Sequence, residues 1–205
     1  MKLYTSVGPN PHMVRMFAAE KGLSLPMVEV DLMGGENRRP PYNESVNKAG
    51  QTPALELEGG QIVSEITVIC EYLEEKHPTP ALIGSTPEER AETRMWTRRI
   101  DLNICEPMAN GFRASEGRRL FESRMKLVGA EGAADLKAIA KDRLLWLNGL
   151  MGDNQFVCGD RFTLADVLLY CFLTFGAQVA QPIPDEAGWV KAWYERVKAR
   201  PSASA

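Results

Sequence analysis

The sequence is poor in residues that bind metals or form disulfides. Its 205 residues include only two histidines and four cysteines. The cysteines are spread along the chain, at Cys70, Cys105, Cys158 and Cys171, with no CxxC pair and no spacing typical of a metal site. We therefore expect no metal site. Because Cys70 and Cys171 lie in apolar helical patterns, where a free cysteine packs as a small hydrophobe, we expect reduced thiols and a cytoplasmic protein.

Long hydrophobic runs and an excess of one charge are also absent. The longest apolar run, VLLYCFLTFGA at 167–177, is shorter than the roughly 20 residues that cross a bilayer. The MKLY start contains no hydrophobic segment of a secretion signal. The formal net charge is −3, and the arginines at 90–99 and 113–119 are typical of solvated helix faces. These features argue against a membrane or a nucleic acid as the main partner.

The first part of the chain alternates strand and helix patterns. The overall composition, 44% hydrophobic and 25% charged residues, is typical of a soluble globular protein. In the first helical pattern Met13, Phe17 and either Met16 or Glu20 share the apolar face. The expected elements are strands at 2–6 and 26–32, a loop at 34–45, a hairpin at 52–65, and helices at 11–22 and 65–78. This βαβ-loop-ββα order predicts an α/β thioredoxin-like domain.

The rest of the chain shows almost no strand pattern. Helices are expected at 87–113, 132–152, 163–177 and 188–201. The third of these opens with Thr163 and Asp166 at the spacing of a capping box, in which two side chains bond to backbone N–H groups of the first turn. We therefore predict a thioredoxin-like domain at 1–78, a proline-rich linker at 79–87 and an all-α domain at 88–205.

The stretch SVGPNPHMVR at 6–15 joins the first strand to the first helix. Pro11 suits a first helical position, which would make Asn10 the N-cap. An amide has an accepting and a donating end, so Asn10 could cap the helix and also donate to a group in front of it. Ser6, at the end of the first strand, is a second donor, or simply a strand-end serine. Asn10 as a cap and Asn10 as a ligand contact both remain open on these residues alone.

Three motifs in this order resemble the cytosolic glutathione transferase family over essentially the whole chain. They are NKAGQTPALEL at 47–57, VSEITVICEYLEEKHP at 63–78 and GDRFTLADVLLY at 159–170. The resemblance implies an α/β thioredoxin-like N-terminal domain followed by an all-α C-terminal domain. It also implies glutathione as the co-substrate and no metal.

The resemblance also implies which residues hold glutathione. Thr52 would offer its backbone N–H and C=O to the cysteinyl unit, beside a cis-proline at Pro53. Glu65 would face the γ-glutamyl ammonium. The chain departs from the family at Ile66, where a serine is usual, and at Gln51, where a lysine is common. Both departures bear on glutathione affinity.

The loop 34–45 contains two arginines that could compensate for the missing lysine. Arg38 or Arg39 would then bind the glycyl carboxylate of glutathione. Alternatively, both are solvated loop charges.

The family places a catalytic Tyr, Ser or Cys in the loop before its first helix. GPNPH most resembles the bacterial, Nu-like classes that carry Pro-Asn there. A free thiol titrates near 8.5, and lowering that pKa by one unit takes roughly 1.4 kcal/mol of thiolate stabilisation. One hydrogen bond to a charged group contributes about 1.5–3 kcal/mol. Asn10 is thus the expected thiolate contact, with Ser6 as the alternative.

A second substrate would bind between the two domains. His12, Met108 and Phe112 are the candidates for lining that pocket. Alternatively, Met108 and Phe112 belong to a helical core, and His12 faces solvent or packs in its loop. The predicted activity is transfer of glutathione to a small apolar electrophile. The alternatives are a glutathione-dependent peroxidase or disulfide-bond reductase, and a non-catalytic binding or regulatory protein of this fold. By analogy with the family, a homodimer is expected.

Overall fold

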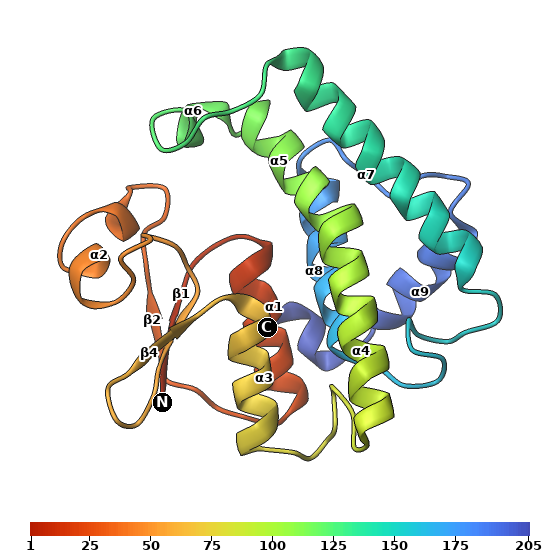
Figure 1. The fold of residues 1–205 in the computed structure, drawn as a ribbon, viewed down its shortest axis with the longest axis horizontal. Coiled ribbons are helices and arrows are strands. Elements are labelled where there is room, and N and C mark those ends of the chain that lie inside the picture. Colours follow the sequence, from red (N-terminus) through yellow and green to blue (C-terminus); the bar gives the residue numbers. More distant parts are fainter. The chain divides into compact units, whose positions relative to one another are not determined.

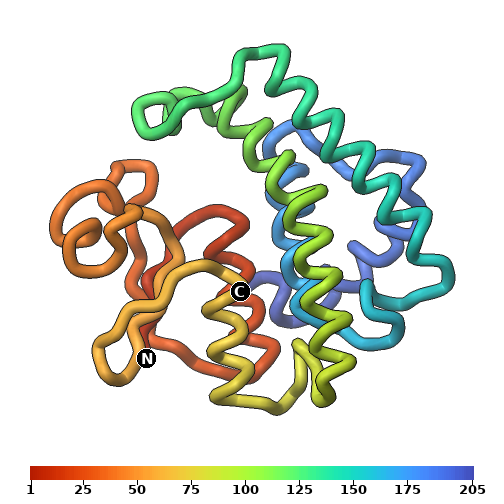
Figure 2. The backbone as a smooth tube through the Cα atoms, in the orientation of Figure 1, coloured from red at the N-terminus to blue at the C-terminus, as the bar shows by residue number.

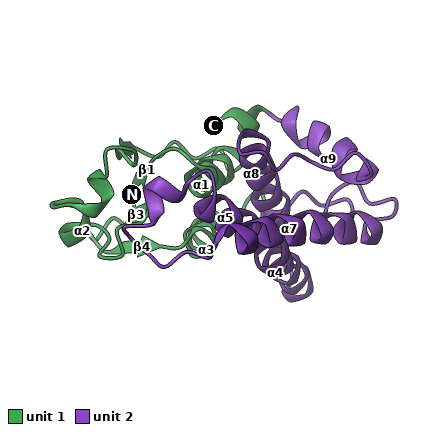
Figure 3. Cartoon of the chain, turned by 90° about the horizontal axis from the view of Figure 1, so that it is seen from above, with its two compact units in different colours: residues 1–85, 201–205 green, residues 86–200 purple.

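The computed structural model describes residues 1–205 (Figure 2). They form two compact units (Figure 3). Unit 1 comprises residues 1–85 and 201–205, and unit 2 comprises residues 86–200. The sequence had placed 201–205 in the helical domain. They belong to unit 1 because its first helix binds them: a ring nitrogen of His12 lies 3.0 Å from the Ala203 carbonyl oxygen, and Ser202 donates to Glu20.

Unit 1 is a four-stranded sheet with helices, in the order predicted for a thioredoxin-like domain (Figure 1). Its elements are β1 (Lys2–Thr5), α1 (Pro9–Glu20), β2 (Met27–Glu29), a 3-10 turn (Glu36–Arg38), α2 (Tyr42–Ser45), β3 (Ala54–Glu56), β4 (Ile62–Ser64), α3 (Ile66–Lys76) and a C-terminal 3-10 turn (Pro201–Ser204). The strand order is β2-β1-β3-β4, with β1 and β2 parallel and the other pairs antiparallel. The predicted fold class of this half is confirmed.

The core of unit 1 lies where α1 and α3 pack together. Met13, Met16 and Phe17 of α1 are fully buried, which resolves the choice between Met16 and Glu20 in favour of Met16. Ile69 and Leu73 supply the buried face of α3. The apolar stripe of each helix at three-to-four spacing therefore forms this interface.

A buried ion pair fixes the chain after α3. The Lys21 ammonium lies 2.6 Å from the Glu74 carboxylate and donates to the Pro80 carbonyl at 2.5 Å. Both oxygens of Glu74 in turn accept backbone N–H groups, those of Leu82 (3.2 Å) and Ile83 (2.8 Å). These contacts tie the ends of α1 and α3 to the segment that leads out of unit 1.

The regular elements of unit 2 are all helices, as predicted, and the segment 156–161 adds two isolated β-bridges. The helical elements are α4 (Pro87–Ile100), a π-helical turn (Asp101–Cys105), α5 (Glu106–Ala114), α6 (Arg118–Phe121), α7 (Ala130–Leu150), α8 (Leu164–Gln178) and α9 (Gly188–Lys198). The sequence predicted one regular helix over 87–113, but the π-helical turn interrupts it. Pro107 has no N–H for the carbonyl four residues earlier, that of Asn103, and a wider turn accommodates this missing bond.

Helix α8 is buried along most of its length, packs against α4 and α9, and begins with the predicted capping box. The Asp166 carboxylate accepts from the Thr163 N–H and hydroxyl, and from Val157 N–H (2.9 Å) and Trp193 Nε1 (2.8 Å). Burial nevertheless raises the pKa of Asp166 to about 6.

No helix of the structure combines the length and the apolar character needed to cross a membrane.

Candidate functional site

The turn between β1 and α1 differs by two residues from the sequence expectation. Gly8 has φ 110°, which favours glycine, and it occupies the N-cap position without a side-chain cap. Helix α1 begins at Pro9, whose fixed φ suits a first helical position. The prediction that Pro11 starts the helix and that Asn10 is its N-cap is therefore wrong. Asn10 is the second helical residue.

Asn10 holds the free donors at the start of α1. Pro9 and Pro11 have no N–H, and the N–H of His12 bonds to the Gly8 carbonyl at 3.3 Å. Neither the backbone N–H nor the side-chain amide of Asn10 has a hydrogen-bond partner, and the residue is half-buried. One residue thus offers two donors at the positive end of a helix, where anions are favoured.

Ser6 is already engaged within the protein. It is 2% exposed, and its Oγ lies 2.6 Å from the Thr52 hydroxyl oxygen. The Arg15 guanidinium of α1 donates to the Thr5 hydroxyl (2.7 Å) and to the Ser6 carbonyl (3.1 Å). The structure thus joins the end of β1 to Thr52 through Ser6, and sequence reasoning missed the role of Arg15 beneath this loop.

Residues 47–53 form the cis-proline turn, named for the cis bond between Thr52 and Pro53, which the family resemblance implied. The backbone N–H and C=O of Thr52 have no hydrogen-bond partner within the chain. A donor and an acceptor on one residue can pair with an extended peptide in the manner of a neighbouring β-strand. Thr52 therefore offers an unpaired peptide edge, at the position where the family resemblance predicts the cysteinyl contact.

Side chains from the preceding loop hold the cis-proline turn in place. The Gln51 carbonyl accepts from the Tyr42 hydroxyl (2.7 Å) and from Asn47 Nδ2 (3.0 Å), and the Gly50 carbonyl accepts from Asn37 Nδ2 (2.5 Å). Burial raises the pKa of Tyr42 to about 12, so its hydroxyl remains a donor at neutral pH. Sequence reasoning missed these supports. The one available signal was an aromatic residue, Tyr42, inside an otherwise polar loop.

The start of α3 has an unusual backbone. Glu65 occupies the N-cap position with φ 71°, in the left-handed region that a residue with a side chain seldom adopts. Its side chain is exposed and forms no ion pair. Ile66 is the first residue of the helix and is half-buried. Although the serine hydroxyl of the family is missing here, the backbone N–H groups of the first turn remain.

The two loop arginines point to different parts of unit 1. Arg38 donates to the Ala49 carbonyl at 3.2 Å, at the cis-proline turn that also contains the exposed Gln51. Arg39 donates to the Gly34 carbonyl at 2.8 Å, within its own loop. The structure therefore brings Arg38, and not Arg39, to the residues predicted to bind glutathione.

The three residues predicted to line a second-substrate pocket have separate environments. His12 of unit 1 contacts Ala203, and burial lowers the pKa of its imidazole. Phe112 of unit 2 makes edge-to-face contacts with Phe121 and Phe175, with ring centroids 6.2 and 5.0 Å apart. Met108 is 3% exposed. Within unit 2, Met108 is buried and Phe112 is half-buried among aromatic rings, and their role in a second-substrate pocket stays a prediction.

The chain contains no group of three or more His, Cys, Asp or Glu side chains that could hold a metal ion. All four cysteines are free and buried. Unit 1 offers two donor groups at Asn10, a peptide edge at Thr52 and a carboxylate at Glu65. This set matches a peptide with an ionisable thiol and an ammonium group.

Comparison with known proteins gives the family. The sequence model of the glutathione S-transferase N-terminal domain matches residues 7–76, and that of the C-terminal domain matches residues 131–201. Glutathione S-transferase 2 of Saccharomyces cerevisiae is 31% identical, over 97% of this chain and 85% of that protein. The crystal structure of Gtt2 from Saccharomyces cerevisiae has a TM-score of 0.90 at 31% identity, over 100% of this chain and 99% of that one. A glutathione S-transferase domain-containing protein of Marinobacter aquaeolei has a TM-score of 0.91 at 34% identity, over 99% and 100% of the two chains. The chain belongs to the glutathione S-transferase family.

Proposed function

We propose that this glutathione transferase binds glutathione on unit 1, with the cysteinyl unit paired to Thr52 and the thiolate beside Asn10. The free donors of Asn10 carry this proposal, because a thiolate needs hydrogen-bond donors and this turn provides two without partners. The free backbone N–H and C=O of Thr52 support the placement of the peptide.

The energy required is modest. Lowering a thiol pKa from its usual value near 8.5 to about 7.5 takes roughly 1.4 kcal/mol. A hydrogen bond to a charged acceptor contributes about 1.5–3 kcal/mol, and a helix N-terminus adds about 0.3–1 kcal/mol. Asn10 combines both effects, so no general base is needed. The thiolate then attacks an electrophilic carbon of an apolar substrate, a C–S bond forms, and the leaving group departs with the electron pair.

The ends of glutathione would be held by charge. Glu65 faces the γ-glutamyl ammonium, and the N–H groups at the start of α3, beginning with Ile66, face the γ-glutamyl carboxylate. Arg38 is the candidate for the glycyl carboxylate, because it already lies at the cis-proline turn. We place the enzyme in the cytoplasm as a homodimer, on the analogy of its family.

Binding to immobilised glutathione and conjugation of chlorodinitrobenzene test this proposal together. We expect retention on the resin, a thermal shift at millimolar glutathione, and chloride release that depends on glutathione. Retention without conjugation of chlorodinitrobenzene and without glutathione-dependent reduction of a peroxide would favour the non-catalytic alternative. Absence of both retention and thermal shift would overturn the proposed site.

A further inference from the structure

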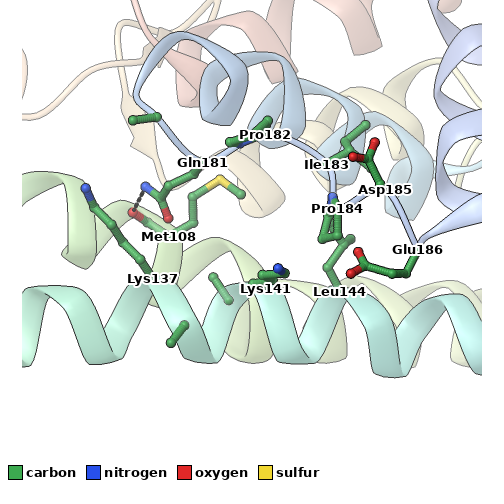
Figure 4. Close-up of a pocket in the computed structure, with 13 residues that line it drawn as sticks. Met108, Lys137, Lys141, Leu144, Gln181, Pro182, Ile183, Pro184, Asp185 and Glu186 are labelled. Atoms are coloured by element: carbon green, nitrogen blue, oxygen red, sulfur yellow. Dashed lines mark hydrogen bonds between the residues drawn. The ribbon is translucent and has the colours of Figure 1, made fainter.

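Unit 2 contains a cavity of about 470 Å³ between α7 and the segment 180–186 (Figure 4). Its lining comes from unit 2 alone and includes none of the residues assigned to glutathione. The apolar part consists of Met108, Ala138, Ala140, Leu144, Ala180, Pro182, Ile183 and Pro184, and the polar part consists of Lys137, Lys141, Gln181, Asp185 and Glu186. The volume falls within the roughly 300–1,000 Å³ typical of small-molecule sites.

Near the end of α8, Gly176 lies close to Gln181 and Met108, and this contact forms one wall of the cavity. A Cβ on Gly176 would lie 2.7 Å from the Gln181 carbonyl oxygen and 3.1 Å from the Met108 side chain. The Gln181 N–H also bonds to the Gly176 carbonyl at 2.9 Å. Only glycine allows this contact, and it holds both Met108 and Gln181 at the cavity, so the cavity is largely preformed.

Gln181 carries an acceptor that the protein leaves unused. Its Nε2 donates to the Met108 carbonyl at 3.1 Å, which fixes the orientation of the amide (Figure 4). Its Oε1 is buried and has no hydrogen-bond partner. Buried polar atoms without a partner are rare and costly. A molecule in the cavity with one N–H or O–H group would satisfy this acceptor.

The charges around the cavity balance one another. Lys137 binds the Glu116 carboxylate at 2.6 and 2.7 Å, and Asp185 pairs with Lys191. Of the remaining lining residues, Lys141 and Glu186 carry one charge of each sign. A charged ligand would thus gain little attraction here while losing its hydration. The apolar lining therefore favours an uncharged ligand.

We propose that this cavity binds an uncharged, largely apolar molecule with a single N–H or O–H donor, such as a secondary amine or an alcohol, whose donor bonds to Gln181 Oε1. The site is separate from the proposed glutathione site and does not depend on it. It gives the helical unit a ligand-binding role of its own.

N-phenylnaphthylamine is a suitable probe because it is neutral, has one N–H, and fluoresces when buried. Phenoxynaphthalene is the matched probe without a donor, and anilinonaphthalenesulfonate is the matched probe with a charge. Calorimetric and fluorescence titrations of the full chain would contain saturating S-hexylglutathione, which occupies the proposed glutathione site. We expect the amine to bind about fivefold more tightly than the ether, the size of effect that one hydrogen bond gives. The sulfonate should bind no more tightly than the amine.

Three variants test where the probe binds and whether it bonds to Gln181. Ile183→Trp fills the cavity and should abolish binding, whereas Ile139→Trp, at an exposed position of α7 outside the lining, should leave it unchanged. Gln181→Leu should reduce amine affinity to that of the ether and leave the ether unaffected. Equal affinity of amine and ether for the unmodified protein, an equal loss of both in Gln181→Leu, or unchanged binding in Ile183→Trp would each overturn the proposal. Amine binding that occurs only when S-hexylglutathione is left out would also overturn it.

Discussion

The hydroxyl oxygens of Ser6 and Thr52 lie 2.6 Å apart and join the end of β1 to the cis-proline turn. One hydroxyl donates to the other, so Ser6 uses its polar group inside the protein. In this arrangement Ser6 positions Thr52, and Thr52 presents its free backbone N–H and C=O. We therefore propose Ser6 as a positioning residue for the peptide part of glutathione, and Asn10 as the contact for sulfur.

Ser6→Ala should therefore weaken glutathione binding without changing the apparent pKa of the bound thiol. Loss of one hydrogen bond predicts an increase of about fivefold in KM for glutathione. Thr52→Val is the matched variant, because it removes the other half of the same bond, and the double variant should be no worse than either single one. Steady-state kinetics with varied glutathione would measure this. A rise in the apparent pKa of bound glutathione in Ser6→Ala would instead make Ser6 the sulfur contact.

Asn10→Ala should raise the apparent pKa of bound glutathione by about 1–2 units, because a side-chain hydrogen bond to the thiolate, which contributes about 1.5–3 kcal/mol, is lost. The backbone N–H remains, so the shift should be partial. Asn10→Asp should raise the pKa further, since it replaces a donor by a negative charge. The thiolate absorbance of the bound complex as a function of pH measures both. An unchanged pKa in both variants would show that the Asn10 side chain does not contact the thiolate.

The elements of both units could be predicted because their signals are local. Hydrophobic periodicity, Gly59-Gly60 in the hairpin and the capping box at Thr163 and Asp166 each act within a few residues, and all are present in the structure. The start of α1 was misplaced because Pro9 and Pro11 both suit a first helical position. The left-handed φ of Gly8 decides between them, and it depends on how the chain leaves the sheet.

The supports of the candidate site could not be predicted in the same way. The bonds from Tyr42 and Asn37 to the cis-proline turn, and from Arg15 to Ser6, depend on loop conformations that no sequence period encodes. The return of residues 201–205 to unit 1 depends on contacts with α1, which lies far away in sequence. Family resemblance supplied the candidate residues, and the structure supplied the hydrogen bonds that fix their positions.

Asp166 should make part of the stability depend on pH. Its folded pKa of about 6 exceeds the ordinary value of 3.8, so the folded state binds a proton more readily than the unfolded state. The contribution of this group to the free energy of unfolding is therefore greatest below pH 3.8 and falls by up to about 3 kcal/mol as pH rises through 6. Urea unfolding of the protein and of Asp166→Asn across this range would give the difference curve. A flat difference would contradict the raised pKa.

Asp166→Ala tests the capping network separately. The substitution leaves donors of Thr163, Val157 and Trp193 buried without an acceptor, so we expect a loss of about 3–5 kcal/mol at neutral pH. Asp166→Asn keeps an acceptor and should lose less. Equal losses in the two variants would mean that the charge, and not the accepting oxygens, holds the network together.

The buried ion pair between Lys21 and Glu74 should contribute to the free energy of unfolding. Lys21→Met removes the cation and leaves the Glu74 carboxylate largely buried, with only the N–H groups of Leu82 and Ile83 as partners. Breaking a buried pair in this way typically costs about 3–5 kcal/mol. Denaturant unfolding of the full chain measures this loss.

A second substitution identifies the cause of that loss. If the unpaired charge dominates, adding Glu74→Gln to Lys21→Met should recover about 1–2 kcal/mol, because it removes the charge and keeps an acceptor for the backbone. If instead the lost bond from Lys21 to the Pro80 carbonyl dominates, the double variant should be no more stable than Lys21→Met. Because Lys21 also stacks over Phe17, with 5.6 Å between Nζ and the ring centroid, methionine is the substitution that best preserves apolar packing on that ring. The recovered free energy therefore reports on charge and not on a cavity.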